Sequence, residues 1–214
     1  MRRSLRMTSV VREGGPIRQD LLMASIALFH SILGVRPGEL DGARRLTEAG
    51  HDVRVIDQYE GEVFDDYDDA TRYARTVGYS ELIGRALAAT LDLPDNFVAL
   101  GFSNGAVMAE YVALHRPVSG VVLVSTAVEV AEVGGQAWPA EVPVQVHHAM
   151  DDQWKEPQQM IDFVGEVQRA GADIEVFDYH QGGHLFTDPS KADEYDQAGA
   201  ELFWERALAF CAKL

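Results

Sequence analysis

A serine stands between two glycines at residues 101–105, in the pentapeptide GFSNG. The apolar run FVAL comes directly before it, and a helix-like pattern, AVMAEYVALHRP, follows it. In a G-x-S-x-G sequence the serine occupies a sharp, strained turn from a strand to a helix, which exposes its hydroxyl. Gly101 and Gly105 leave room at this turn, where side chains would collide with neighbouring elements. We therefore interpret Ser103 as a candidate nucleophile.

A serine hydroxyl is a weak nucleophile, so it needs a base, and the base needs an acid to orient it. In folds that use G-x-S-x-G, the chain order is serine, then aspartate or glutamate, then histidine. Asp151 and Asp152 follow the strand-like VPVQVHHAM, and His184 follows the strand-like DIEVFDY in the loop HQGGHLF. His180 competes as the base but lies nearer the strand. These residues leave Asp151 and Asp152 both open, and we expect the other one to cap the helix near Pro157.

Acyl transfer also requires two backbone N–H groups that bind the oxyanion. One should come from Asn104, the residue after the candidate nucleophile. The other should come from the loop HSILGV behind the first apolar run, where Ile32 is the best candidate. Gly34 lets that loop turn tightly.

Apolar strand-like runs alternate with amphipathic helix-like runs along the whole chain. Such strands, each separated by a helix, predict a mostly parallel sheet covered on both faces, which is a three-layer α/β sandwich. The polar, acidic stretch 58–78 is interpreted as the connection to a helix at 80–93. Between the strands near 120–125 and 142–149, the connection is too short for a lid of several helices. We therefore expect no large cap domain and a shallow, partly open pocket.

The chain has 214 residues, a formal charge of −16 and a single cysteine. This charge disfavours nucleic acids and anionic membranes as partners, and one cysteine excludes a disulfide within the chain. No apolar run reaches the ~18–20 residues that span a bilayer, and no histidine or cysteine cluster has the spacing of a metal site. We expect a cytoplasmic monomer or homodimer with one domain at 23–214. Residues 1–22 are expected to be a disordered extension, and Met23 would be a natural start.

The segments HSILGVRPGELDGARRLTEAGHDVRVIDQYEG, GFSNGA, HHAMDDQW and YHQGGHLFTDPS together resemble the dienelactone hydrolase family of α/β-hydrolases. The resemblance covers roughly residues 25–212. It implies that Asp152, two residues before Trp154, is the acid, and it supports Ile32 as the second oxyanion donor. It further implies that Leu33 and Trp154 are walls of the substrate pocket.

Three features depart from the pattern of this family. Ser103 replaces the cysteine nucleophile of the founding enzymes. Those enzymes also carry a carboxylate beside the oxyanion loop, where this chain has Ser31, and an arginine after the histidine, where this chain has Asp188. Because that arginine serves an anionic lactone, a different substrate is expected here.

The sequence thus predicts a serine hydrolase that cleaves small carboxylic esters or lactones with neither a metal nor an organic cofactor. Ser103 attacks, His184 takes the proton and Asp152 orients the imidazole. Two alternatives stay open: a catalytically silent binding protein with the same fold, and a thioesterase or peptidase that uses the same three residues.

Overall fold

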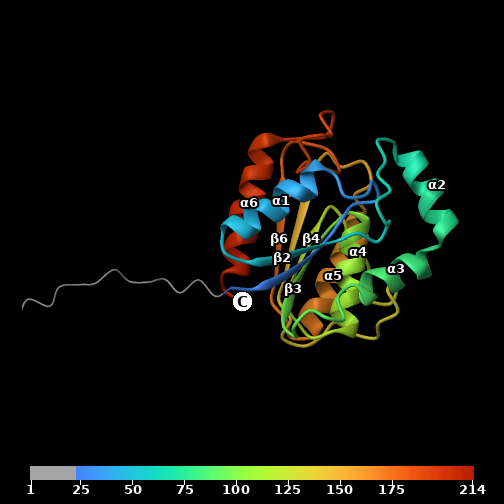
Figure 1. Cartoon of the computed structure of the whole chain (residues 1–214). Helices are drawn as coiled ribbons and strands as arrows, with labels where there is room; N and C mark the ends of the chain where they lie inside the picture. Colours follow the sequence, from blue (N-terminus) through green and yellow to red (C-terminus); the bar gives the residue numbers. More distant parts are fainter. Residues whose placement is uncertain (1–22) are drawn as a thin grey trace, which may run out of the picture.

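The computed structural model describes residues 23–214, so the expectation about residues 1–22 lies outside it (Figure 1). Six strands form one sheet in the order β2-β1-β3-β4-β5-β6, and each neighbouring pair is parallel. The strands are β1 (Ser25–Phe29), β2 (Asp52–Ile56), β3 (Phe97–Phe102), β4 (Val118–Val124), β5 (Val144–Ala149) and β6 (Ile174–Tyr179). The helices are α1 (Pro37–Glu48), α2 (Tyr67–Val77), α3 (Tyr79–Ala88), α4 (Asn104–His115), α5 (Pro157–Arg169) and α6 (Gln197–Cys211).

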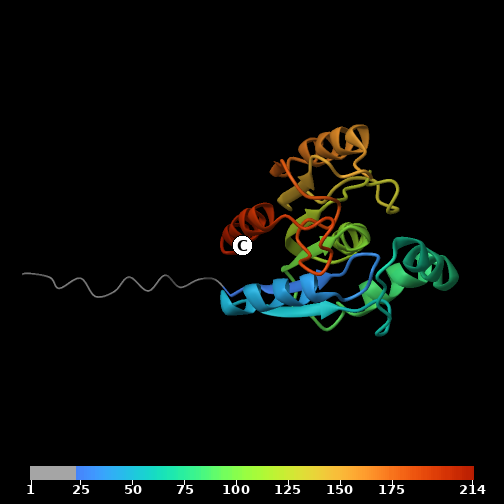
Figure 2. The ribbon, with the colours of Figure 1, turned by 90° about the horizontal axis from the view of Figure 1, so that it is seen from above.

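Helices cover both faces of this sheet, which confirms the predicted three-layer α/β fold. Because alternate side chains of a strand point to opposite faces, β1 contributes to two separate cores. Ala27 and Phe29 belong to the core shared with α3, α4 and α5. Ile26 and Leu28 belong to the core on the other face, with α6 and Leu46 of α1. Figure 2 shows α1 and α6 on one side of the sheet, and α4 and α5 on the other.

The strand order creates a crevice at the carboxyl end of the sheet. The chain moves from β1 outward to β2, and then crosses to the other side of β1 to form β3. The loops that follow β1 and β3 therefore leave the sheet in opposite directions. Such a switch point is where open α/β sheets bind their ligands. The loop with Ile32 and the turn with Ser103 lie on its two sides.

Helix α2 lies within the stretch that the sequence analysis interpreted as a connection, and that interpretation was wrong. Asp66 caps the helix, since its carboxylate accepts hydrogen bonds from the backbone N–H groups of Asp68 and Asp69. Its polar and apolar positions are well separated, but the buried ones are Ala70 and Ala74, so the helix contains no run of large apolar residues. The helix projects away from the sheet (Figure 1). No large cap domain is visible in residues 23–214, and every helix described there is too short or too polar to cross a membrane.

Candidate active site

Ser103 lies in a strained turn between β3 and α4. Its φ of 52° and ψ of −118° are unusual for a residue with a side chain. A Cβ at Gly101 would lie 2.0 Å from the carbonyl oxygen of Gly105, and one at Gly105 would lie 2.3 Å from that of Phe29. Both positions therefore require glycine, for the reason expected from the sequence. The turn places the Ser103 hydroxyl at the start of α4, facing the crevice.

Three loops bring together the serine, histidine and aspartate that the sequence analysis selected. The Ser103 hydroxyl lies 2.6 Å from Nε2 of His184, which follows β6. Nδ1 of the same ring lies 2.7 Å from Oδ2 of Asp152, which follows β5. The second oxygen of Asp152 accepts a hydrogen bond from the backbone N–H of Trp154, at 2.9 Å. This chain of hydrogen bonds can draw the hydroxyl proton of Ser103 toward His184.

The environment of Asp152 keeps its carboxylate ionised. Burial by itself acts to raise the pKa of Asp152. The hydrogen bond to His184 and its electrostatic interaction with that ring, with the N–H of Trp154, outweigh burial and lower the pKa of Asp152 below its usual range. An ionised carboxylate fixes the tautomer of His184 with its proton on Nδ1, which leaves Nε2 free to accept.

The two competing residues lie outside this arrangement. Asp151 and His180 are exposed, and neither lines the cavity that contains Ser103. The expectation that the unused aspartate caps α5 was wrong. The N-cap of α5 is Glu156, and no side chain caps this helix. Pro157 at its first position lacks an N–H, which leaves one donor fewer to satisfy.

Two backbone N–H groups stand free beside Ser103. Among residues 23–214, neither Ile32 nor Asn104 donates its backbone N–H to any hydrogen-bond acceptor, and both residues line the cavity. The Ile32 loop is held by Glu39 of α1, whose carboxylate accepts from the N–H of Ser31 and the N–H of Arg36, each at 3.0 Å. Glu39 thereby fixes both ends of the loop. A carboxylate does lie at this loop, but α1 supplies it rather than position 31.

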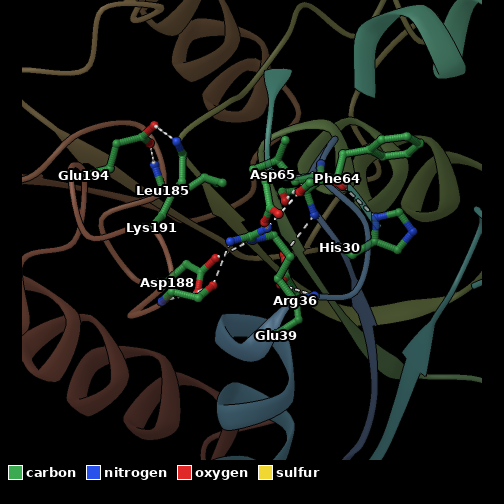
Figure 3. A network of polar contacts seen from close by, with 12 residues as sticks. His30, Arg36, Glu39, Phe64, Asp65, Leu185, Asp188, Lys191 and Glu194 are labelled. Atoms are coloured by element: carbon green, nitrogen blue, oxygen red, sulfur yellow. Dashed lines mark hydrogen bonds and ion pairs between the residues drawn. The ribbon is translucent and has the colours of Figure 1, made fainter. Parts of the chain in front are cut away.

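Arg36 connects the same loop to two other segments (Figure 3). Its Nε donates to Asp188 at 2.9 Å, beyond the candidate histidine in sequence. Its Nη1 donates to the carbonyl oxygen of Phe64 and to Asp65, just before α2, at 2.7 and 2.8 Å. Asp188 is therefore the buried partner of Arg36 and does not face the cavity.

The loop that carries His184 is held from both sides. The Ser125 hydroxyl, at the end of β4, donates to the carbonyl oxygen of His184. Glu194 accepts from the N–H of Leu185 at 2.6 Å through its side chain, and from the N–H of Gly183 at 2.8 Å through its carbonyl. A Cβ at Gly183 would lie 2.7 Å from Cγ of Glu194. The absence of a side chain at Gly183 therefore permits close packing against Glu194.

A cavity of about 380 Å³ opens above Ser103. Trp154 lies in its wall, with its ring centroid 4.7 Å from that of His184. Leu33 differs from its predicted role as a pocket wall: it is fully buried beside Ala70 and Leu185, so it supports the wall from behind. The lining residues are Ile32, Tyr67, Asp68, Thr71, Tyr79, Ser103, Asn104, Val107, Thr126, Trp154 and His184.

Helix α2 supplies a part of this wall that the sequence analysis missed. Tyr67 packs edge-on against Trp154, with ring centroids 4.6 Å apart, and Asp68 and Thr71 line the cavity from the same helix. The capping aspartate at position 66 and the amphipathic pattern of residues 67–77 were the available signals for this helix. Glu39 stands at the third position of α1 behind Pro37, which is a helix-start pattern but does not reveal its contact with Ser31. Ser125 and Glu194 carry no motif that would have identified them.

The parallel sheet, the strained serine turn and the histidine after the last strand define an α/β-hydrolase. The dienelactone hydrolase family model matches residues 17–214, and the chain belongs to this family of hydrolases. A search of curated protein sequences finds no match.

Within residues 23–214, no three histidine, cysteine or acidic side chains gather in a group that could hold a metal ion.

Solved structures with the same fold have diverged far in sequence. A promiscuous phosphotriesterase similar to dienelactone hydrolase, from metagenomic libraries, superposes with a TM-score of 0.76 at 21% identity, covering 89% of this chain and 86% of its own. Alpha/beta hydrolase domain-containing protein 10 from mouse gives 0.66 at 13% identity, with coverage of 88% and 90%. Esterase PE8 gives 0.59 at 17% identity, with coverage of 89% and 92%. At these identities the likeness describes the fold alone.

Proposed function

We propose that the protein hydrolyses small, neutral carboxylic esters or lactones through a covalent acyl-enzyme on Ser103. The observation that carries this proposal is the chain of contacts at 2.6 and 2.7 Å that joins Ser103, His184 and Asp152. The free backbone N–H groups beside Ser103 support the same chemistry, because acyl transfer develops negative charge on the carbonyl oxygen.

In the first half of the reaction, the Ser103 oxygen attacks the substrate carbonyl while Nε2 of His184 takes its proton. The N–H groups of Ile32 and Asn104 hold the resulting oxyanion. The intermediate collapses, the bond to the leaving alcohol breaks, and His184 returns the proton to that alcohol. Asp152 stabilises the imidazolium through both steps.

In the second half, a water molecule attacks the acyl group on Ser103 as His184 takes one of its protons. The second intermediate releases the carboxylic acid, and the proton returns from His184 to the serine oxygen. The reaction consumes one water for each ester bond, and the chain supplies every proton-transfer group.

The cavity supports a small and uncharged substrate. Its volume is about 380 Å³, near the lower end of the range for small-molecule sites. Asp68 places a carboxylate in its wall, and no lysine or arginine of the described chain lines it. An anionic ester would therefore be repelled, whereas a neutral one would not.

The proposal can be tested with a fluorophosphonate probe and p-nitrophenyl acetate. The probe labels an activated serine, and we expect it to label the wild-type protein but not Ser103→Ala. The same substitution should lower kcat/KM for p-nitrophenyl acetate by at least ~10³-fold. Ser119→Ala is the matched control, since it removes a hydroxyl near the start of β4 that has no hydrogen-bond partner in the described chain, and it should keep the labelling. Near-normal turnover by Ser103→Ala would refute the mechanism.

A further inference from the structure

The side chain of Asn104 is a buried amide with no hydrogen-bond partner in the described part of the chain. Asn104 is the first residue of α4, is only 7% exposed, and lines the cavity beside Ser103. Within residues 23–214, none of the side-chain hydrogen bonds involves this amide, and its nitrogen is shielded from solvent without a partner. Buried polar groups are nearly always hydrogen-bonded, so an exception beside a nucleophile requires an explanation.

Other uncharged polar groups of the cavity are also free. Thr71 and Thr126 both line it, and neither hydroxyl hydrogen-bonds to another residue of the described chain. The Tyr67 hydroxyl, by contrast, is bound to Glu194. The cavity thus offers neutral hydrogen-bonding groups, whereas Asp68 is its one acidic wall residue among those described. A purely hydrocarbon acyl chain would leave the buried amide nitrogen of Asn104 without a hydrogen-bond partner.

We propose that Asn104 recognises a hydrogen-bonding oxygen next to the ester carbonyl of the substrate. This inference rests on the proposed function and makes it more specific: the preferred acyl group is short, uncharged and oxygenated, as in hydroxy- or alkoxyacyl esters. Because Asn104 directly follows Ser103, the atom it meets lies close to the reacting carbonyl. Rotation about the terminal torsion of asparagine is soft, so either the amide nitrogen or its oxygen can turn toward the substrate.

Two isosteric substrates test this recognition. The acyl groups of p-nitrophenyl methoxyacetate and p-nitrophenyl butyrate differ only in an oxygen that replaces a methylene. We expect Asn104→Leu to lower the ratio of kcat/KM for methoxyacetate over butyrate by ~3–10-fold, which is the range of one neutral hydrogen bond. The intrinsic reactivities of the esters cancel, because both appear in the ratio for each protein. Any effect of the substitution on stabilisation of the oxyanion cancels as well, because it applies to both esters.

Leu114→Ala is the matched control, since it shortens an aliphatic residue of the same helix that does not line the cavity. It should leave the methoxyacetate-to-butyrate ratio unchanged. A folded Asn104→Leu protein with the wild-type ratio would overturn the proposal.

A binding measurement keeps the test independent of turnover and of the folding of the variant. Methoxyacetamide and butyramide bind without being cleaved, and their dissociation constants for wild-type protein can be measured by NMR titration. We expect the methoxy compound to bind several-fold more tightly, and equal or weaker binding would overturn the proposal. If the methoxy compound binds more tightly but neither ester is hydrolysed, the recognition stands while the proposed hydrolysis fails.

Discussion

The carboxylate of Glu194 holds the hydroxyl of Tyr67, with its two oxygens 2.9 and 3.0 Å from the hydroxyl oxygen. Burial and the negative charge of Glu194 raise the pKa of Tyr67, so the phenol stays protonated and donates. The same carboxylate accepts the N–H of Leu185, next to His184. One side chain therefore joins the cavity wall formed by α2 to the loop that positions the candidate base.

We expect Tyr67→Phe to lower kcat/KM for p-nitrophenyl butyrate by ~2–10-fold, because one hydrogen bond that orders the wall is lost. Glu194→Ala should cost more, since it also releases the N–H of Leu185. The two effects should be non-additive in a double-mutant cycle, because the residues share one contact. Tyr79→Phe is the control: it removes a cavity phenol that makes no hydrogen bond in the described chain. Fully additive effects would show that the contact does not couple α2 to the histidine loop.

The adjacent aspartates should differ sharply in their effect on turnover. Asp152→Ala should lower kcat on the order of 10²–10⁴-fold, because His184 loses the group that orients it. Asp151→Ala should leave kcat and the melting temperature close to wild type, because Asp151 is exposed and caps no helix. Steady-state kinetics and thermal unfolding of both variants provide the measurement. A larger loss of kcat in Asp151→Ala would assign the acid to the other position.

Acyl chain length should affect the rate only up to the size of the cavity. We expect the highest kcat/KM for acyl groups of roughly two to six carbons. Burial of apolar surface contributes ~25 cal/mol per Å² of binding free energy, and methylenes beyond the cavity wall bury little such surface. The measurement compares p-nitrophenyl acetate, butyrate, octanoate and palmitate under identical conditions. A clear preference for palmitate would reveal a deep apolar tunnel.

A buried glutamate predicts a pH-dependent stability. Glu110 of α4 is fully buried; one oxygen accepts the N–H of Val128 at 3.0 Å, and the other has no partner in the described chain. Burial raises the pKa of Glu110 well above its usual range, although the N–H of Val128 opposes this effect. The folded state therefore keeps the proton at pH values where the unfolded chain has released it. Its contribution to stability is present below an unfolded pKa of ~4.3 and is lost as pH rises toward the folded value.

Glu110→Gln should relieve this loss, because glutamine keeps an acceptor for Val128 without a charge. We expect the melting temperature of the variant, relative to wild type, to rise between pH 5 and pH 8. Each unit by which the folded pKa is raised corresponds to about 1.4 kcal/mol. Glu205→Gln is the control, because it neutralises an exposed carboxylate of α6 that is not among the charges acting on Glu110. A pH-independent difference for Glu110→Gln would contradict the prediction.

The fold could be predicted because each apolar run was long, continuous and separated from the next by a helix. The residues around Ser103 could be selected because parallel strands bring their following loops to one edge, and each loop offered few suitable residues. Asp152 required the family resemblance, since both aspartates follow the same strand. In the structure, the burial of Asp152 and the exposure of Asp151 separate them.

The remaining parts of the site depend on where side chains point, which sequence patterns do not encode. Arg36 and Asp188 are 152 positions apart, and no periodicity links them. Helix α2 is amphipathic, but it buries alanines and exposes many charges, so no run of large apolar residues marks it as a helix of the core. Leu33 lies one residue beyond the predicted oxyanion donor, yet its side chain turns into the core instead of the cavity.

The position of α2 in the chain has an evolutionary consequence. The wall segment at 67–77 is one uninterrupted stretch outside the sheet, whereas Ser103, Asp152 and His184 each follow a different strand. Substitutions in that stretch at positions other than Tyr67 can therefore change which molecules are accepted without disturbing the reacting groups. A duplicated gene could acquire a new substrate selectivity through changes in a few neighbouring codons. Related proteins should therefore diverge in selectivity within the segment 67–77 before they diverge in chemistry.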